Sequence, residues 1–539
     1  MPDSKNSKSS RTSKKPVKRK LRVKPRVKSR VGTHGISHGI FPLLMVMAAA
    51  ALVSALAIWF LYSQNYLLYY GDAQAHLAIA RRVVDSRTPG WEQIGTVWLP
   101  LPHVLMLPFV GNTFLWRTGL AGTIPSAVCF VIATGFLFGA ARRAFHSTTA
   151  GFTAAALFAL NPNMLYLQAL PMTESVYFAS LLGLLYFLIR FHHYPSVPTV
   201  MGASLAALAA TMCRYEGWFL LPFVAIYIFW RAGTNRWIAA LLFILITAAG
   251  PLLWLWHNLW YCGNALEFYN GPYSPQAIQG GRDYPGKGDW ITALHFFQAA
   301  AVLNTGWPLA ILGMIGAVVS AARRTWIPLV ILTLPMIFYV LNMHSGASPV
   351  FVPALYNDSY YNTRYGLALL PFAAFCTAGL VAGPWPKPIA LICVLMSVIP
   401  WLAYPKPANW ITWKESQVNS EVRRSWTGEA ARYMKVHYKP RDGMLMPFSD
   451  VVGIPREAGI DLREIVHEGN GLLLDATLVK PLLFPQCRWA VAISGDHVSR
   501  RIAAWSRRGL YWDLVKTVEV KGSPPIEIYR RRSDVVAQR

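Results

Sequence analysis

The stretch that decides the fold is FPLLMVMAAAALVSALAIWFLY, residues 41–62, a run of 22 residues without a charge. About 20 apolar residues in a helix cross a bilayer, whereas the apolar core of a signal peptide has roughly 7–15. We therefore interpret the run as a retained membrane span. Residues 1–30, which precede it, carry 13 Lys and Arg against one acid, Asp3. By the positive-inside rule, this charge places the N-terminus in the cytoplasm.

Further apolar runs follow toward the C-terminus, at about 118–141, 149–169, 175–191, 199–213, 217–230, 237–260, 299–321, 326–343, 365–382 and 388–404. Residues 31–404 hold 16 Lys and Arg and 9 Asp and Glu, so only 25 charges occupy 374 positions. A surface with so few charges suits a bilayer and not water. The sequence therefore predicts a polytopic α-helical membrane protein with about 11 spans.

The charges of the loops are sorted by side. With the N-terminus inside, every inner loop is basic and lacks acids, and all nine acids of the membrane region fall on the outer side. An odd number of spans then places the C-terminal part in the periplasm or outside the cell. We expect a multi-pass protein of a bacterial cytoplasmic membrane. The inner basic residues are Arg142, Arg143, Arg190, Arg231, Arg236, Arg323, Arg324 and Lys387.

Three segments are expected. Residues 1–40 form a basic, disordered cytoplasmic tail held against anionic lipid; because residues 1–30 contain no aromatic residue, the tail offers no stacking platform and nucleic acid is not an expected partner. Residues 41–404 form the transmembrane domain. Residues 405–539 carry 22 Lys and Arg and 15 acids and predict a small extracytoplasmic α/β domain. Its expected strands are 443–450, 488–494 and 525–531, and its expected helices are 420–437 and 497–508.

Several outer loops have a structure of their own. In 72–86 the apolar residues Ala73, Leu77, Ala80 and Val84 share one helical stripe, away from Arg81, Arg82 and Asp85, which predicts an interfacial helix. The Pro-rich piece 99–110 is too short to span and is expected at the surface. The loops 261–290 and 344–363 are rich in Gly, Pro and aromatic residues and are expected to roof a cavity.

Asp72 stands ten residues after the first span, at the start of the interfacial helix. It suits two roles, a helix N-cap favoured by the dipole and a general base. His76 lies one turn later on the same face, where it could bond Asp72 or a substrate hydroxyl, or be a plain interfacial histidine.

Five further charges lie at outer ends of spans. Glu174 follows Thr173, as an acid in the first turn of a helix follows the N-cap residue. Arg214 and Glu216 lie between two apolar spans, as a structural ion pair or as a clamp for an anionic group, because an unpaired charge is costly there. Arg364 and Arg117 are lone cations suited to lipid headgroups or to substrate. Their convergence around one cavity is stronger evidence for a site than any one residue.

An acid soon after the first span, followed by a helix carrying Ala-Arg-Arg at 80–82, resembles the C-type multispan glycosyltransferases that use lipid-linked sugars. RTGLAGTIPS (117–126) opens the second span, and NPNMLYLQALPMTES (161–175) closes the third with an acid. This order resembles the family-39-like group, which contains protein O-mannosyltransferases and bacterial aminoarabinose transferases. The resemblance covers about residues 41–220, and the later spans by topology alone.

The resemblance implies that Asp72 is the catalytic base, that Glu174 assists it, and that Arg117 supports the site. The chain also departs from the family. The mannosyltransferases carry an Asp-Glu pair where this chain has Asp72 and Ala73, which puts a protein acceptor in doubt. Glu174 stands where the aminoarabinose enzymes have Asp. The C-terminal segment differs from the β-trefoil insertion of the mannosyltransferases and is closer in placement to the terminal outer domain of the bacterial enzymes.

Together these features predict a hexosyl or pentosyl transferase that moves a sugar from a polyprenyl-phosphate carrier to a hydroxyl of a glycan, lipid or protein on the outer face. Arginines would hold the phosphate and a carboxylate would take the acceptor proton, so no metal or other cofactor is expected. The expected partners are the donor, the acceptor and membrane lipids. A multispan transporter or flippase of a lipid-linked or polar substrate is the alternative, although no internal repeat is visible.

Overall fold

The computed structural model describes residues 34–279, 281–357, 359–383, 385–403, 409–480 and 487–532. The chain separates into two compact units, Met1–Phe41 and Pro42–Arg539. Most of the predicted tail, 1–40, lies outside the described residues. Residues 34–40 already belong to the first helix, which begins earlier than the hydropathy pattern predicts.

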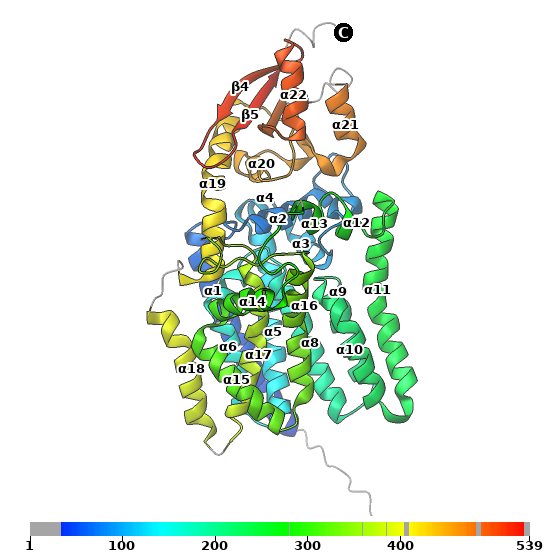
Figure 1. Cartoon of the computed structure of the whole chain (residues 1–539), viewed down its shortest axis with the longest axis vertical. Helices are drawn as coiled ribbons and strands as arrows, with labels where there is room; N and C mark the ends of the chain where they lie inside the picture. Colours follow the sequence, from blue (N-terminus) through cyan, green and yellow to red (C-terminus); the bar gives the residue numbers. More distant parts are fainter. Residues whose placement is uncertain are drawn as a thin grey trace, which may run out of the picture. The chain divides into compact units, whose positions relative to one another are not determined.

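Helices occupy every stretch that the hydropathy pattern marks as a span (Figure 1). By length and composition, six helices among the described residues could cross a membrane, or seven if the bent pair α14–α15 counts as one span. This criterion does not confirm the predicted 11 spans, because several of the helices are short. The helices are α1 (His34–Ser63), α5 (Leu120–Ala144), α6 (Thr148–Ala159), α7 (Pro162–Gln168), α8 (Glu174–His193), α9 (Val197–Thr211), α10 (Glu216–Arg231), α11 (Arg236–Cys262), α14 (Trp290–Thr305), α15 (Trp307–Ala322), α16 (Trp326–Ser345), α17 (Leu369–Leu380) and α18 (Pro386–Ala403).

Two predicted spans are broken. The run 149–169 divides into α6 and α7, because the Asn161 side chain accepts a hydrogen bond from Met164 N and starts a new helix. The run 299–321 divides at Gly306, where α14 and α15 meet at 108°. Gly306 has a φ of 86°, a conformation that favours glycine. Hydropathy alone does not register such a corner, because the apolar residues continue through it.

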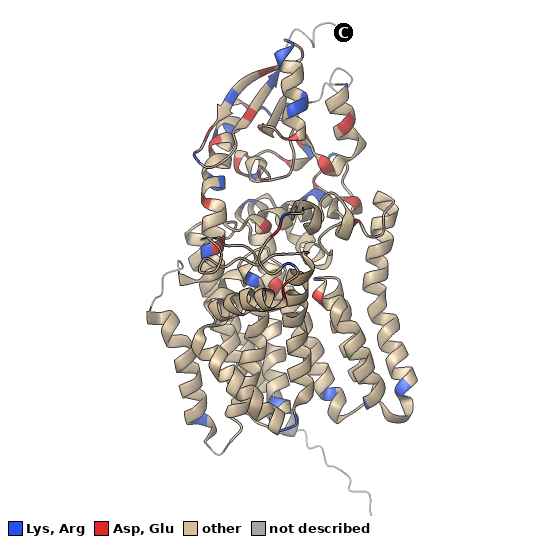
Figure 2. Ribbon diagram, in the orientation of Figure 1, with Lys and Arg blue, Asp and Glu red and all other residues tan. Residues whose placement is uncertain are grey.

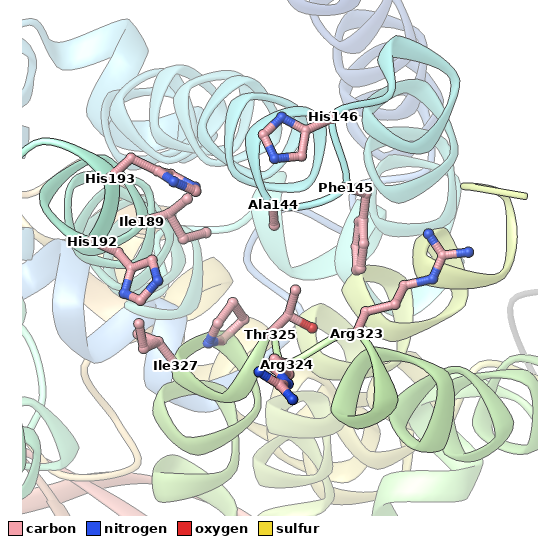
Figure 3. Close-up of a pocket in the computed structure, with 11 residues that line it drawn as sticks. Ala144, Phe145, His146, Ile189, His192, His193, Arg323, Arg324, Thr325 and Ile327 are labelled. Carbon is pink, nitrogen blue, oxygen red and sulfur yellow. The ribbon is translucent and has the colours of Figure 1, made fainter.

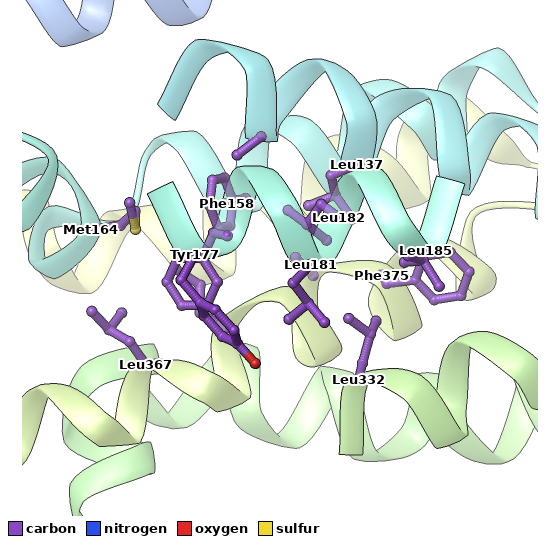
Figure 4. Close-up of a cluster of buried hydrophobic side chains, with 14 of the residues drawn as sticks. Leu137, Phe158, Met164, Tyr177, Leu181, Leu182, Leu185, Leu332, Leu367 and Phe375 are labelled. Carbon is purple, nitrogen blue, oxygen red and sulfur yellow. The ribbon is translucent and has the colours of Figure 1, made fainter. Parts of the chain in front are cut away.

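The core of the helical part is a continuous cluster of buried apolar side chains (Figure 4). Phe158, Leu181, Leu182 and Phe375 come from α6, α8 and α17 and meet there. Close helix contacts surround it. A Cβ atom at Gly316 of α15 would collide with the Cys376 carbonyl of α17, so glycine at this position permits the two backbones to approach.

The segment after α1 forms several short helices, of which the sequence predicted the first. Helix α2 (Gly71–Val84) buries Ala73, Leu77 and Ala80, whereas Val84 is 49% exposed. Arg81 and Asp85, which were expected away from the buried stripe, are buried as well. They pair with each other at 2.8 Å, and Arg463 also pairs with Asp85. The neighbouring short elements are η1 (Trp91–Ile94), α3 (Leu101–Val110), α4 (Thr113–Thr118), α12 (Glu267–Asn270), α13 (Pro275–Gln279) and η3 (Thr363–Ala368).

The C-terminal region contains a five-stranded mixed sheet in the order β2-β1-β3-β5-β4. β1 is parallel to β2 and β3, while β5 is antiparallel to β3 and β4. Trp489 and Val491 of β3 share a cluster with α19, and the alternating Ala490 and Ala492 share another with α22. The elements are α19 (Ile411–His437), β1 (Met444–Leu445), α20 (Gly453–Ala458), η5 (Leu462–Glu464), β2 (Ile465–Val466), η6 (Glu468–Asn470), α21 (Leu472–Val479), β3 (Trp489–Ile493), α22 (His497–Arg507), β4 (Trp512–Val518) and β5 (Ile526–Arg531).

The three ranges predicted as strands contain β1, β3 and β5. The two predicted helices coincide with the C-terminal part of α19 and with α22. The pattern missed β2 and β4. β2 is only two residues long, and β4 interrupts its polar-apolar alternation at a register shift between Leu514 and Lys516.

The charges of the described residues are unevenly placed (Figure 2). Basic side chains stand without neighbouring acids at the lower ends of the helices, whereas acids gather at the opposite helix ends and in the C-terminal region. This distribution agrees with the sorting of loop charges seen in the sequence.

Candidate active site

A cavity of about 310 Å³ opens at the helix ends where the acids gather. The predicted roof loops both contribute to it: Phe268 and Gln276 come from 261–290, and Ser348 comes from 344–363. Its other walls are formed by His76, residues 97–99, Met172, Thr173, residues 213–216, Phe338, Tyr339, Asn342, Arg364 and Tyr365. The loops therefore cover polar groups that would otherwise lie at the open ends of apolar helices.

Arg364 lies in the cavity wall and contacts acids from two distant parts of the chain. Its Nη2 donates to Asp72 Oδ2 at 2.6 Å, and its Nε lies 3.2 Å from Glu174 Oε1. Its Nη1 donates to the Tyr70 hydroxyl at 2.7 Å. Arg364 thus joins the start of α2 to the start of α8.

Arg214 completes the network. Its Nε donates to Glu216 Oε1 at 2.7 Å, and its Nη1 donates to Thr173 Oγ1 at 2.7 Å and Glu174 Oε1 at 3.2 Å. Its Nη2 donates to the Tyr339 hydroxyl at 3.0 Å. One oxygen of Glu174 therefore faces both arginines. The other, Oε2, is buried and has no hydrogen-bond partner among the described residues.

An aromatic ring separates the two cations. The Tyr365 ring lies 5.3 Å from the Arg214 guanidinium carbon and 5.4 Å from that of Arg364, and it stacks on Tyr339 at 4.5 Å. Cation–π attraction to the shared ring stabilises both charges in addition to their ion pairs. Each guanidinium has five N–H donors, more than these contacts use, so a ligand in the cavity can still be bound.

Asp72 is not the cap of α2. Tyr70 occupies the N-cap position, and Asp72 lies in the first turn with Arg364 as its partner. Its side chain is 36% exposed and lies beside the cavity wall, not within it. Glu174 begins α8 after Thr173, as predicted, and reaches the wall through the two arginines.

His76 lines the cavity but does not use Asp72 as its partner. Its Nδ1 lies 2.9 Å from His103 Nε2, and its ring lies 4.3 Å from that of Trp98. Burial, with the charges of Arg364 and Arg214 acting in the same direction, lowers the pKa of His76 to about 3. His76 is therefore neutral at pH 7 and can exchange a hydrogen bond but not neutralise a phosphate.

Arg117 lies elsewhere, and the structure does not bring it into contact with the other predicted site residues. Its side chain is exposed, and Nη2 donates to the Gly459 carbonyl at 3.1 Å. Its own carbonyl accepts from Arg456 Nη1 at 2.9 Å. Arg117 connects α4 to the C-terminal region because it stands at the exposed end of that helix.

Glu415 is a buried carboxylate that the sequence did not single out. It accepts from Asn362 N at 2.9 Å and from Thr363 N at 2.8 Å, and also from the hydroxyls of Thr363 and Tyr70. These partners flank Arg364 and Asp72 in the chain. Glu415, at the fifth residue of α19, is therefore a positioning residue for both. It lies in ITWKES, where no periodicity or motif distinguishes it.

Among the described residues, no group of three or more His, Cys, Asp or Glu side chains is placed to hold a metal ion. The acids of the site are instead paired with arginines. Three carboxylates and two guanidiniums beside a cavity can bind a phosphate through the cations and receive a proton on a carboxylate.

Comparison with known proteins bears on the fold. Residues 111–261 match the family model of the dolichyl-phosphate-mannose-protein mannosyltransferases. ArnT from Cupriavidus metallidurans bound to undecaprenyl phosphate is similar in structure, with a TM-score of 0.55 at 12% identity over 91% of this chain and 98% of that one. Its apo form gives a TM-score of 0.55 at 12% identity over 90% and 98%. No curated protein matches this sequence.

The matched segment 111–261 contains Glu174, Arg214 and Glu216, and the structural likeness extends over nearly the whole chain. The chain is thus a membrane protein with the fold of ArnT, and its resemblance to the family-39-like, C-type membrane glycosyltransferases is confirmed.

Proposed function

We propose that this chain is a membrane glycosyltransferase that moves a sugar from a polyprenyl-phosphate carrier to a hydroxyl acceptor on the outer face of a bacterial cytoplasmic membrane. One observation carries the proposal: Asp72, Glu174 and Glu216 converge with Arg214 and Arg364 beside one cavity. The undecaprenyl phosphate bound by ArnT, a protein of the same fold, supports a carrier of this class.

The reaction requires one bond to form and one to break at the anomeric carbon. The acceptor oxygen attacks that carbon, the carbon–oxygen bond to the phosphate breaks, and the acceptor proton passes to a carboxylate. Polyprenyl phosphate leaves with the negative charge. In-line displacement of this kind inverts the anomeric configuration.

We assign the leaving phosphate to Arg214 and Arg364, because both line the cavity and both are held in fixed directions by ion pairs. Charge-assisted hydrogen bonds from preorganised donors strengthen where water is excluded. This positive charge meets the need of a monophosphate leaving group without a metal.

We assign the proton to Asp72. It is partly exposed next to the cavity, whereas Glu174 is buried and enclosed between two arginines. In this assignment Glu174 fixes the spacing of the arginines, and its unpartnered Oε2 is available to a sugar hydroxyl. His76 and the aromatic walls would contact the sugar.

Deletion of the gene in its native host tests the function. We expect surface glycans that lack one sugar and a raised level of the corresponding polyprenyl-phosphate sugar, both measured by mass spectrometry. Unchanged glycans and carriers would contradict glycosyl transfer.

Expression of variants in the deletion strain then tests whether Asp72 is the base. Asp72→Asn keeps the shape of the side chain but removes the proton acceptor, so transfer should fall roughly 10²–10⁴-fold. Asp283→Asn is the matched control, because Asp283 is a 99% exposed acid paired only with Lys287 among the described residues. Full restoration by Asp72→Asn would contradict the base and leave the function standing.

A further inference from the structure

A second cavity, of about 370 Å³, lies at the other end of the helices that carry the active site. We call it the basic cavity. Its polar side chains are His146, His192, His193, Arg323, Arg324 and Thr325 (Figure 3). Figure 3 shows the three imidazoles along one wall and Arg324 and Thr325 across from them.

The basic cavity is separate from the active site. Helix α8 begins at Glu174 in the active-site network and ends at His193 in the basic cavity. A helix of 20 residues is about 30 Å long, the thickness of the hydrocarbon core of a bilayer. The two cavities are therefore at opposite membrane surfaces if α8 spans, and the basic cavity cannot hold the reacting end of the donor.

The lining favours an anion. None of the eleven lining residues is acidic, while two are arginines and three are histidines. Guanidinium forks match the oxygens of a phosphate group, and each imidazole can donate at least one N–H. Because no carboxylate lines the cavity, no lining side chain neutralises the charge of the two arginines. A bound anion would neutralise that charge.

The donors are held by the surrounding backbone. Arg324 adopts a φ of 60°, an uncommon conformation for a residue with a side chain. The turn is fixed because Arg324 N donates to Ala321 O at 2.9 Å and Thr325 Oγ1 donates to Ser320 O at 2.7 Å. Across the cavity, His192 Nδ1 lies 3.1 Å from the Tyr227 hydroxyl. A ligand would meet a fixed backbone at Arg324 and side chains of Thr325 and His192 that are already hydrogen-bonded.

The remaining wall is apolar and is formed by Phe145, Ile189, Ile327 and Pro328. A free ion would leave this surface unused, whereas the acyl chains of a phospholipid would cover it. We propose that the basic cavity binds a phosphate-bearing anion, and that its source is the headgroup of an anionic membrane phospholipid.

The test measures lipid retained by the purified full-length protein. Phosphatidylglycerol is titrated into protein in neutral detergent, and bound lipid is counted by native mass spectrometry, with phosphatidylcholine, which is zwitterionic and has no net charge, as the comparison. We expect Arg324→Gln combined with His193→Gln to weaken the tightest phosphatidylglycerol binding roughly tenfold or more, as loss of charge-assisted hydrogen bonds does. Arg236→Gln is the matched control, because Arg236 is a cation at the start of α11 that does not line the cavity.

Competition by inorganic phosphate separates the two sources of the anion. Little displacement of phosphatidylglycerol by millimolar phosphate supports the headgroup, whereas full displacement would overturn that source and assign the cavity to free phosphate. Equal lipid retention by the double variant and the wild type would overturn the proposal. Thermal unfolding in lipid-free detergent shows whether the double variant is folded, and Arg324→Lys, which keeps the charge, is measured beside it so that a folding defect in the double variant still leaves a second readout.

Discussion

At the residue scale, the site depends on the geometry of arginine and not on positive charge alone. Arg364 reaches Tyr70, Asp72 and Glu174 with three different nitrogens. A lysine ammonium is a single point charge and cannot hold three partners in these directions. The active-site network is thus specified by the shape of the guanidinium.

We predict that Arg364→Lys lowers the rate of sugar transfer at least tenfold, because a charge-assisted hydrogen bond contributes about 1.5–3 kcal/mol and at least one would be lost. Arg117→Lys should change the rate little, since Arg117 is exposed and contacts the C-terminal region. Transfer assays on the two purified variants check this. A fully active Arg364→Lys would show that charge alone is sufficient.

His76 gives a pH prediction. Its pKa is lowered to about 3 by burial and then by Arg364 and Arg214, against an ordinary value of 6.5. Between pH 6.5 and pH 3, the unfolded chain therefore binds a proton at this histidine that the folded chain does not bind. The contribution of neutral His76 to the free energy of unfolding is fully present above pH 6.5 and is lost as the pH falls toward 3.

We accordingly expect the melting temperature of the wild type to fall more between pH 7 and pH 4.5 than that of His76→Gln, measured by thermal unfolding in detergent. His437→Gln, at an exposed histidine of α19, should follow the wild type. Parallel curves for His76→Gln and the wild type would contradict a buried neutral His76.

Much of the active-site network was accessible from the sequence for one reason: charges at the ends of apolar spans are rare. This criterion selected Asp72, Glu174, Arg214, Glu216 and Arg364, and the structure joins all five. It could not select Tyr70, Thr173 or Tyr339, because hydroxyl groups are common at the ends of spans and carry no mark of their partners. Arg117 met the same criterion but belongs to another contact.

At the scale of the element, α19 holds the site from outside the helical core. Four donors, two backbone N–H groups and two hydroxyls, converge on the carboxylate of Glu415, which is 2% exposed. They fix η3 and the start of α2, the elements that carry Arg364 and Asp72. The spacing between these two residues is therefore set by a third segment of the chain.

We predict that Glu415→Gln lowers kcat more than it raises KM for the lipid donor. The amide would turn an N–H toward donors, which leaves buried groups unsatisfied at about 1–3 kcal/mol and releases η3. Glu421→Gln, an exposed position on the same helix, is the control. Glu415→Asp, which keeps the carboxylate, should recover part of the rate. A purely structural role would instead lower the melting temperature and change kcat and KM to a similar extent.

Helix existence was predictable from hydropathy, but helix breaks were not. The corner of 108° at Gly306 and the restart at Asn161 occur inside continuous apolar runs. Both are stabilised by tertiary contacts. The amides of Asn161 and Asn163 donate to the carbonyl of Asn304, the residue that lies two before the corner. Such long-range pairing leaves no period in the sequence.

At the scale of the whole molecule, side-chain contacts constrain the topology. Arg463 and Asp85 pair at 2.7 Å, and Gln93 Nε2 donates to the Gly469 carbonyl at 2.7 Å. These bonds join the C-terminal region to the segment after α1. Because neither partner can act through a bilayer, both must be on the same side of it, and an even number of crossings separates them.

The final prediction follows from this constraint. If α1 spans with the basic residues 1–30 inside, the segment after it and the C-terminal region are both outside. The positive-inside rule places Lys387 inside, and with this side α18 has to cross. Reporter fusions after Lys387, near the start of α18, and after Trp410, just before α19, should therefore report opposite sides, the first cytoplasmic and the second outer. The fusion after Trp410 removes the partners of Asp85, so the same reporter at the C-terminus of the full chain serves as the control and should also read outside. Same-side signals at Lys387 and Trp410 would make α18 a surface helix, and a cytoplasmic C-terminus would move the Asp72 network to the inner face and exclude an outer acceptor.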